Sequence, residues 1–229
     1  DLYGKGRLNS QGFDLSNENV LQQLQQELNR AAAQQFQTAS IVNGKSRPVG
    51  AGQQVRNPAD HSDVVGSVSF ADAALAQEAV AAAVAAQSAW NGTPAAERAA
   101  CLRRFADLLE RHAPALMMLA VREAGKTLNN AIAEVREAVD FCRYYADEAE
   151  HTLPQGSQGV GTIVAISPWN FPLAIFTGEV VAALAAGNTV VAKPAEQTSL
   201  IAGYAVSLMH EAGIPTSALQ LVLGAGDVG

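Results

Sequence analysis

The chain has 229 residues, 48% of them hydrophobic, and a formal net charge of −7. It is long enough to bury one sizeable core or two small ones. Arginines alternate with acids, as in 97–111 and 134–143, so no basic stripe indicates nucleic acid as a partner. We find neither an apolar run near the roughly 18 residues of a membrane span nor a signal-peptide pattern, so a cytoplasmic protein is expected.

The cysteines and histidines show no spacing typical of a metal site. Cys101 and Cys142 lie in helical patterns among apolar neighbours, which predicts two small buried thiols. The histidines share no common spacing, and we assign them no metal; they are His61, His112, His151 and His210.

The first third of the chain predicts one helix and a few short strands. The helix is expected over 17–36, with Asp14 or Ser16 as its cap. Turn residues then separate β-like pieces, which predict a small antiparallel layer. These pieces are 39–42, 53–56 and 64–68.

The middle of the chain predicts four helices. One covers 73–90, a second begins at Thr93-Pro94 and a third at Pro114. A long one begins at Thr127 or Asn129 and ends before Pro154. Gly125-Lys126-Thr127 is no phosphate-binding loop, because Ala120 stands where that motif needs a glycine; a helix end followed by a threonine cap is expected.

From Gly159 onward, strands and helices alternate, which is typical of a parallel sheet. Gly187 is the expected left-handed helix cap, and Pro168 and Pro172 hold Asn170 on an irregular loop. The strands are expected at 159–166, 189–193 and 219–223, and the helices at 173–186 and 199–212.

Two motifs lie at the ends of the first two of these strands. Ser-Pro-Trp-Asn-Phe-Pro covers 167–172, and Lys-Pro-Ala-Glu covers 193–196. With Glu-Ala-Gly-Lys-Thr at 123–127 and Leu-Val-Leu-Gly-Ala-Gly at 221–226, they resemble the aldehyde dehydrogenase superfamily over nearly the whole chain after about residue 40.

The resemblance implies an α/β fold with an incomplete doubly wound parallel sheet, preceded by a helical region with short antiparallel strands. The implied organisation is a connector and helix over 1–38, a helical part over 39–154, and the first part of a Rossmann-like NAD-binding domain over 155–229. Only three strands of that domain lie before Gly229. Such a sheet leaves an open edge, so self-association is expected.

The resemblance also implies roles for individual residues. Asn170 would donate its amide to the oxyanion of the reacting aldehyde, whereas by itself it would be a cap of the turn as readily. Lys193 and Glu196 would bind the adenosine ribose of NAD, the carboxylate repelling the 2′-phosphate of NADP; a bare surface ion pair is the alternative.

Two further groups are implied to line the cofactor cleft and the aldehyde tunnel. Ile166, Ser167, Pro168, Trp169 and Gly226 belong to the cleft, with core packing as the alternative for Trp169. Phe171, Ala174, Ile175 and Gly178 belong to the tunnel, although apolar helix packing explains Ala174 and Gly178 equally well.

The nucleophilic cysteine and general-base glutamate of this family are expected beyond Gly229, and neither Cys101 nor Cys142 matches the nucleophile's motif. The chain alone is therefore not expected to oxidise an aldehyde.

Within the family, residues 1–40, 134–146 and 171–178 are similar to the dehydrogenase modules of bacterial proline utilization A flavoproteins. That similarity implies L-glutamate γ-semialdehyde as the substrate, in proline catabolism, with FAD only in an upstream proline dehydrogenase part. Two alternatives stay open: a non-catalytic assembly module, and a dehydrogenase for another semialdehyde.

Overall fold

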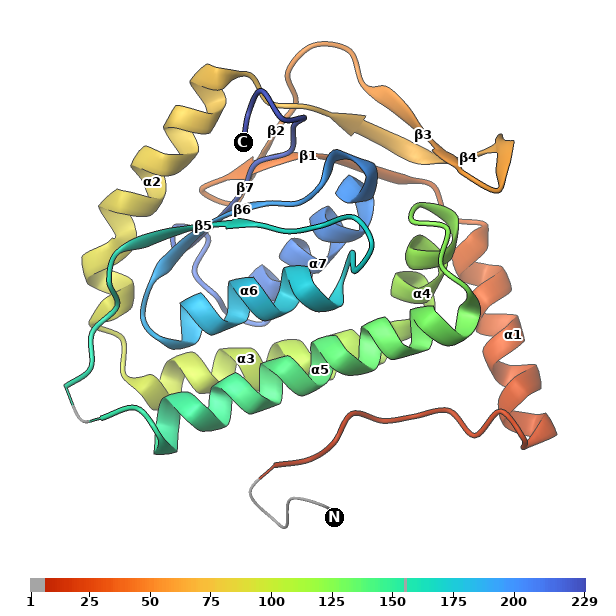
Figure 1. The fold of residues 1–229 in the computed structure, drawn as a ribbon, viewed down its shortest axis with the longest axis horizontal. Coiled ribbons are helices and arrows are strands. Elements are labelled where there is room, and N and C mark those ends of the chain that lie inside the picture. Colours follow the sequence, from red (N-terminus) through yellow and green to blue (C-terminus); the bar gives the residue numbers. More distant parts are fainter. Residues whose placement is uncertain (1–6, 155) are drawn as a thin grey trace.

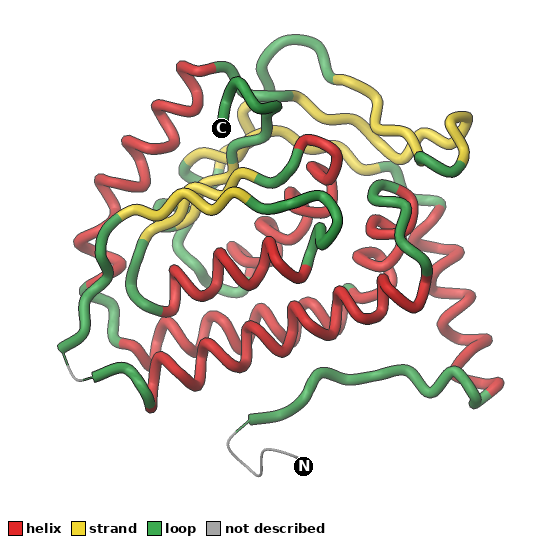
Figure 2. The backbone as a smooth tube through the Cα atoms, in the orientation of Figure 1, coloured by secondary structure: helices red, strands yellow, loops and turns green. Residues whose placement is uncertain are grey.

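The computed structural model describes residues 7–154 and 156–229. Figures 1 and 2 show a twisted sheet with helices on both sides of it. The strands are β1 (Phe36–Val42), β2 (Lys45–Arg47), β3 (Gln53–Asn57), β4 (Asp60–Ser69), β5 (Thr162–Ile166), β6 (Thr189–Lys193) and β7 (Leu219–Leu221). The helices are α1 (Glu18–Ala32), α2 (Ala73–Asn91), α3 (Ala95–Arg111), α4 (Ala113–Arg122), α5 (Leu128–His151), α6 (Ala174–Ala185), the short 3-10 helix η1 (Glu196–Thr198) and α7 (Ser199–Glu211).

The predicted parallel sheet is present, and it continues into the first strands of the chain. β5, β6 and β7 are parallel neighbours, and β1 pairs antiparallel with β7 at Ile41 and Leu221. The strand order is β3-β4-β1-β7-β6-β5, with β2 paired to β1. The expected short antiparallel strands are present as β3–β4 and β1–β2, but they do not form a layer of their own, because β1–β4 is parallel and all these strands belong to one sheet.

The two faces of the sheet are covered by different helices (Figure 1). Along β6, Val190 and Ala192 face the main core, which includes Phe176 of α6. Val191 faces the other way, into a smaller cluster with Leu75 of α2. The alternation follows from the two-residue period of a strand and explains why the central residues of β6, 190–192, are all apolar.

The helical half packs beneath the sheet, with α3 and α5 running side by side below α6 (Figure 1). Thr127 caps α5, its side chain accepting from the Asn130 N–H at 3.3 Å, and Gly187 has φ +88°, as the sequence predicts. The expected cap of α1 is wrong: Asn17 accepts from the N–H groups of the first turn, while Asp14 accepts from Ser16. Helix α1 also stops at Ala32, before the expected end at residue 36.

No helix in the described part of the chain is long and apolar enough to cross a membrane.

Candidate active site

The first two parallel strands end side by side, and this brings the two sequence motifs together. In the β5–β6 ladder Ile166 lies opposite Lys193, and the Ser167 N–H continues the pairing with a 3.3 Å bond to the Lys193 carbonyl. In open α/β sheets, ligands bind at the carboxyl ends of the strands. The residues that follow β5 and β6 therefore face one region of space.

Asn170 lies on the irregular loop between β5 and α6, as the two flanking prolines predict. The residue is exposed, and its side-chain amide makes no hydrogen bond to any described residue. Its main-chain carbonyl accepts a 2.7 Å hydrogen bond from Lys126 Nζ. The side chain therefore does not cap its own turn, and the amide is available to a ligand.

Trp169 and Glu196 line one cavity of about 450 Å³, which also borders Arg56 and Phe70. Trp169 is 56% exposed, so core packing does not explain this residue. The cavity lies between the loop after β5, the helix η1 after β6, and strands β3 and β4. Trp169, predicted to line the cofactor cleft, and Glu196, predicted to bind the ribose, thus lie on the same cavity.

Lys193 is 7% exposed and forms no ion pair with another described residue. Glu196 is half-buried and accepts from the amide of Gln197 at 3.1 Å. The surface ion pair between Lys193 and Glu196 is therefore absent from the described chain. The ammonium group of Lys193 is therefore not held by a carboxylate of the described residues, and it can serve a polar ligand.

Three further cleft residues lie at the same edge of the sheet. Ser167 is buried, and its hydroxyl oxygen has no hydrogen-bond partner among the described residues. Pro168 is half-buried beside it, and Ile166 is 57% exposed. Buried polar groups are almost always paired, so the Ser167 hydroxyl points to a missing polar partner.

Gly226 lies beyond β7, exposed, with open space where a side chain would be. The segment after β7 returns toward β6, since a Cβ at Gly229 would lie 3.7 Å from Lys193 Cε.

Of the four predicted tunnel residues, two are at least partly accessible to solvent and two are buried. Phe171 is 40% exposed and Ile175 is half-buried, whereas Ala174 is fully buried. A Cβ at Gly178 would lie 3.0 Å from the ring of Phe141 on α5. Close packing of α6 on α5 therefore accounts for Gly178.

Both cysteines are buried, as predicted, and burial raises the pKa of each thiol. A thiol held in its neutral form is a poor nucleophile. Among the described residues no group of three or more histidine, cysteine or acidic side chains is placed to hold a metal ion.

Three charged residues that support the Asn170 and Glu196 loops escaped the sequence analysis. They are Glu123, Lys126 and Glu134, around the turn from α4 to α5. All three lie in segments that carry the family resemblance, 123–127 and 134–146, but the sequence assigned them no role. Nothing local connects these residues to loops some 40 to 80 positions away.

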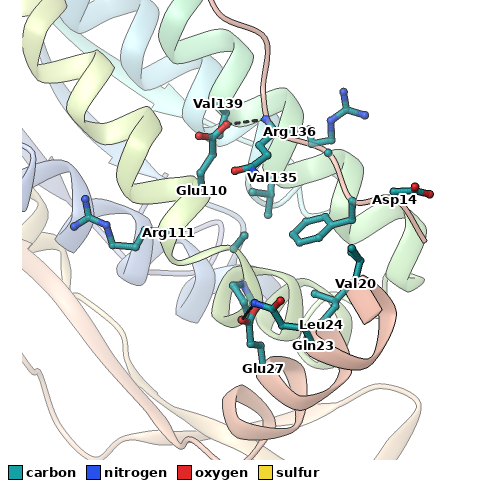
Figure 3. A pocket seen from close by; sticks show the side chains of 15 residues that line it. Asp14, Val20, Gln23, Leu24, Glu27, Glu110, Arg111, Val135, Arg136 and Val139 are labelled. Atoms are coloured by element: carbon teal, nitrogen blue, oxygen red, sulfur yellow. Dashed lines mark hydrogen bonds between the residues drawn. The ribbon is translucent and has the colours of Figure 1, made fainter. Parts of the chain in front are cut away.

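A second cavity of about 420 Å³ lies between the N-terminal segment and α1, α3, α4 and α5 (Figure 3). Its polar lining includes Glu27, Glu110, Arg111 and Arg136, beside apolar side chains such as Leu24. None of the predicted site residues lines it.

Comparison with known proteins finds similarity over nearly the whole chain. The bifunctional protein PutA of Klebsiella aerogenes is 50% identical over 230 residues, which cover 99% of this chain and 17% of that protein. Among solved structures, proline utilization A from Bdellovibrio bacteriovorus matches 97% of the chain and 25% of its own length, with TM-score 0.90 and 32% identity. A 1-pyrroline-5-carboxylate dehydrogenase from Thermus with bound NAD matches 96% of the chain and 46% of its own length, with TM-score 0.88 and 30% identity.

The chain thus spans less than half the length of each of these proteins. Residues 43–229 match the aldehyde dehydrogenase family, and the chain belongs to that family.

Proposed function

We propose that this chain is the oxyanion-stabilising and ribose-binding part of an NAD-dependent dehydrogenase for L-glutamate γ-semialdehyde. The observation that carries the proposal is the pairing of Ile166 with Lys193, which places the Asn170 loop and the Lys193–Glu196 segment at one sheet edge. A cofactor that reaches the Lys193–Glu196 segment can therefore extend toward Asn170.

The chemistry assigned to Asn170 is electrostatic. Attack of a thiolate on an aldehyde carbon converts the carbonyl oxygen into an oxyanion, and a fixed amide donor stabilises that charge as it forms. Asn170 suits this task, because its amide is exposed and unpaired among the described residues while its main chain is held by Lys126. Loss of one such donor costs on the order of a hundredfold or more in turnover.

The strand-end residues fit a dinucleotide. NAD supplies the hydride acceptor when it is bound. Lys193, a residue only 7% exposed, brings an ammonium group without an ion-pair partner among described residues, and Ser167 brings an unpaired buried hydroxyl. Glu196 adds a carboxylate that accepts from ribose hydroxyls and repels a 2′-phosphate, which favours NAD over NADP.

The thiolate and the general base are assigned to residues outside 1–229. Cys101 and Cys142 are buried with raised pKa values, so neither provides a thiolate at neutral pH. The glutamate-derived substrate is supported by the similarity to the PutA and 1-pyrroline-5-carboxylate dehydrogenase proteins.

A chimera tests the proposal. Residues 1–229 replace the matched segment of the Klebsiella aerogenes relative, and NAD reduction is measured with glutamate semialdehyde, succinate semialdehyde and propionaldehyde. We expect the highest kcat/KM for glutamate semialdehyde. A folded chimera that binds NAD but oxidises none of the three aldehydes would contradict the proposal, and a preference for another aldehyde would contradict the substrate.

A further inference from the structure

Two buried carboxylates flank the turn between α4 and α5. Glu123 is 5% exposed and Glu134 is 2% exposed. Glu123 accepts hydrogen bonds from the Leu200 and Ile201 N–H groups at 2.7 and 2.9 Å. Glu134 accepts from the Leu173 and Ala174 N–H groups at 3.1 and 2.9 Å.

Each carboxylate thereby caps a helix that has no side-chain cap of its own. Helix α6 begins after Leu173 and α7 after Thr198, and neither of these residues makes a capping hydrogen bond. The free N–H groups and the positive end of the dipole favour an anion at a helix N-terminus. One short stretch of chain, 123–134, therefore fixes the starting points of both helices.

These helix starts are also the ends of the two loops of the candidate site. The loop with Asn170 runs directly into α6, and η1 with Glu196 runs directly into α7. Displacing either helix start would displace the functional residue just before it.

Lys126 lies between the carboxylates and reaches the first of these loops. Its Nζ lies 3.1 Å from Glu134 Oε1, 2.7 Å from the Asn170 carbonyl oxygen and 4.7 Å from the centroid of the Phe171 ring. The Lys126 side chain is only 15% exposed. Its charge is thus used inside the protein, on the backbone of Asn170, the proposed oxyanion donor.

We propose that Glu123, Lys126 and Glu134 form a positioning bracket, in which Lys126 and Glu134 orient the amide of Asn170 and Glu123 separately places the Glu196 loop. The roles of Asn170 and Glu196 rest on the proposed function, whereas the holding of their loops rests on the hydrogen bonds alone. A misplacement of about 1 Å in a catalytic group costs up to a hundredfold in rate, so the bracket affects catalysis without touching a substrate.

The bracket's two arms predict different kinetic effects in the chimera. Lys126→Met should lower kcat about tenfold and leave the Kd for NAD within about twofold, because only the oxyanion donor moves. At about pH 9, where Glu123 is ionised, Glu123→Gln should raise the Kd for NAD about fivefold and leave kcat at saturating NAD within about threefold, because one carboxylate acceptor becomes an amide donor facing an N–H. Lys45→Met, on exposed β2, is the control for loss of a lysine.

A double-mutant cycle separates positioning from general destabilisation. If Lys126 acts through Asn170, Lys126→Met should change kcat by less than about twofold in an Asn170→Ala background. Lys126→Arg should restore kcat to within about threefold, since a guanidinium also donates to the carbonyl and the carboxylate. If the fold-losses in kcat of the two single variants multiplied in the double variant, the proposal for Lys126 would be overturned.

Hydrogen exchange on the 229-residue chain tests the bracket without any activity. Lys126→Met should speed exchange about tenfold at 167–174 and leave 196–201 unchanged, and Glu123→Gln should do the reverse. Uniform acceleration of both segments in both variants would overturn the separate placement of the loops. An inactive chimera combined with the expected exchange pattern would refute the proposed function while leaving the bracket in place.

Discussion

Ile166 and Lys193, the last residues of β5 and β6, lie directly opposite each other in the parallel ladder. Their pairing means that the loops leaving the two strands start about one strand spacing apart, roughly 5 Å.

Asn170→Ala in the chimera is expected to lower kcat by about a hundredfold or more and to change the Kd for NAD by less than about twofold. The amide is needed only when the oxyanion exists, so ground-state binding is spared. Stopped-flow turnover and NAD titration give the two numbers. Asn129→Ala, at an exposed position in the first turn of α5, is the control. Equal losses in turnover and binding would indicate a purely structural Asn170.

Glu196→Gln is expected to relax the discrimination against NADP, since the carboxylate that repels the 2′-phosphate is gone. Lys193→Ala is expected to raise the KM for NAD. Initial rates with both cofactors measure the two effects, and Glu211→Gln, exposed at the end of α7, controls for a change of net charge. Unchanged cofactor kinetics in both variants would remove Lys193 and Glu196 from the site.

The pH dependence of stability should carry the signature of Glu123. Burial raises the pKa of Glu123 from 4.5 to about 8, and the two backbone N–H donors offset only part of that rise. Between these values the folded state binds more protons than the unfolded state, so stability falls as pH rises through the window. Such a group contributes at most about 1.4 kcal/mol per pH unit.

Glu123→Gln should therefore show a shallower loss of stability between pH 5 and 8 than the unsubstituted chain. Urea denaturation of the isolated 229-residue chain at several pH values measures this difference. If the free energy of unfolding changed with pH in the same way for both proteins, Glu123 would have an ordinary pKa in the folded chain.

Gly66→Ala is expected to lower the free energy of unfolding by about 2 kcal/mol or more. A Cβ at Gly66 would lie 2.0 Å from the carbonyl oxygen of Phe36, its partner on β1, so β1 and β4 would have to separate. Gly52→Ala is the matched control, because its Cβ would meet nothing closer than 3.7 Å. Equal denaturation midpoints for the two variants would contradict the close β1–β4 pairing.

The isolated chain is expected to self-associate through β5. This strand pairs only with β6 among the described residues, and Val164 on it is 52% exposed. An open edge with exposed apolar side chains favours pairing with another chain. Val164→Lys should shift the sedimentation coefficient toward that of the monomer. Val84→Lys, at a 57% exposed position of α2, should leave it unchanged. A monomeric unsubstituted chain at micromolar concentration would contradict this expectation.

Local chemistry explains what could be predicted from the sequence. Pro168 and Pro172 exclude regular structure around Asn170, Gly187 supplies a left-handed turn, and Thr127 caps α5, because each effect acts within a few residues. The order of strands and helices after Gly159 follows from apolar patterning in the same way. The cap of α1 was missed because Asp14, Ser16 and Asn17 all have side chains that suit the role, and only the backbone conformation selects Asn17.

Long-range contacts were decided by the tertiary structure. β1 joins β7 through backbone groups that every residue carries, so the pairing leaves no mark in the sequence. Glu123 and Glu134 cap helices 77 and 40 positions away, because a helix N-terminus accepts any carboxylate that the fold brings to it. The sequence by itself therefore determined the candidate site residues and the breaks in regular structure around them, whereas the tertiary structure decided which charged side chains hold the loops that carry those residues in place.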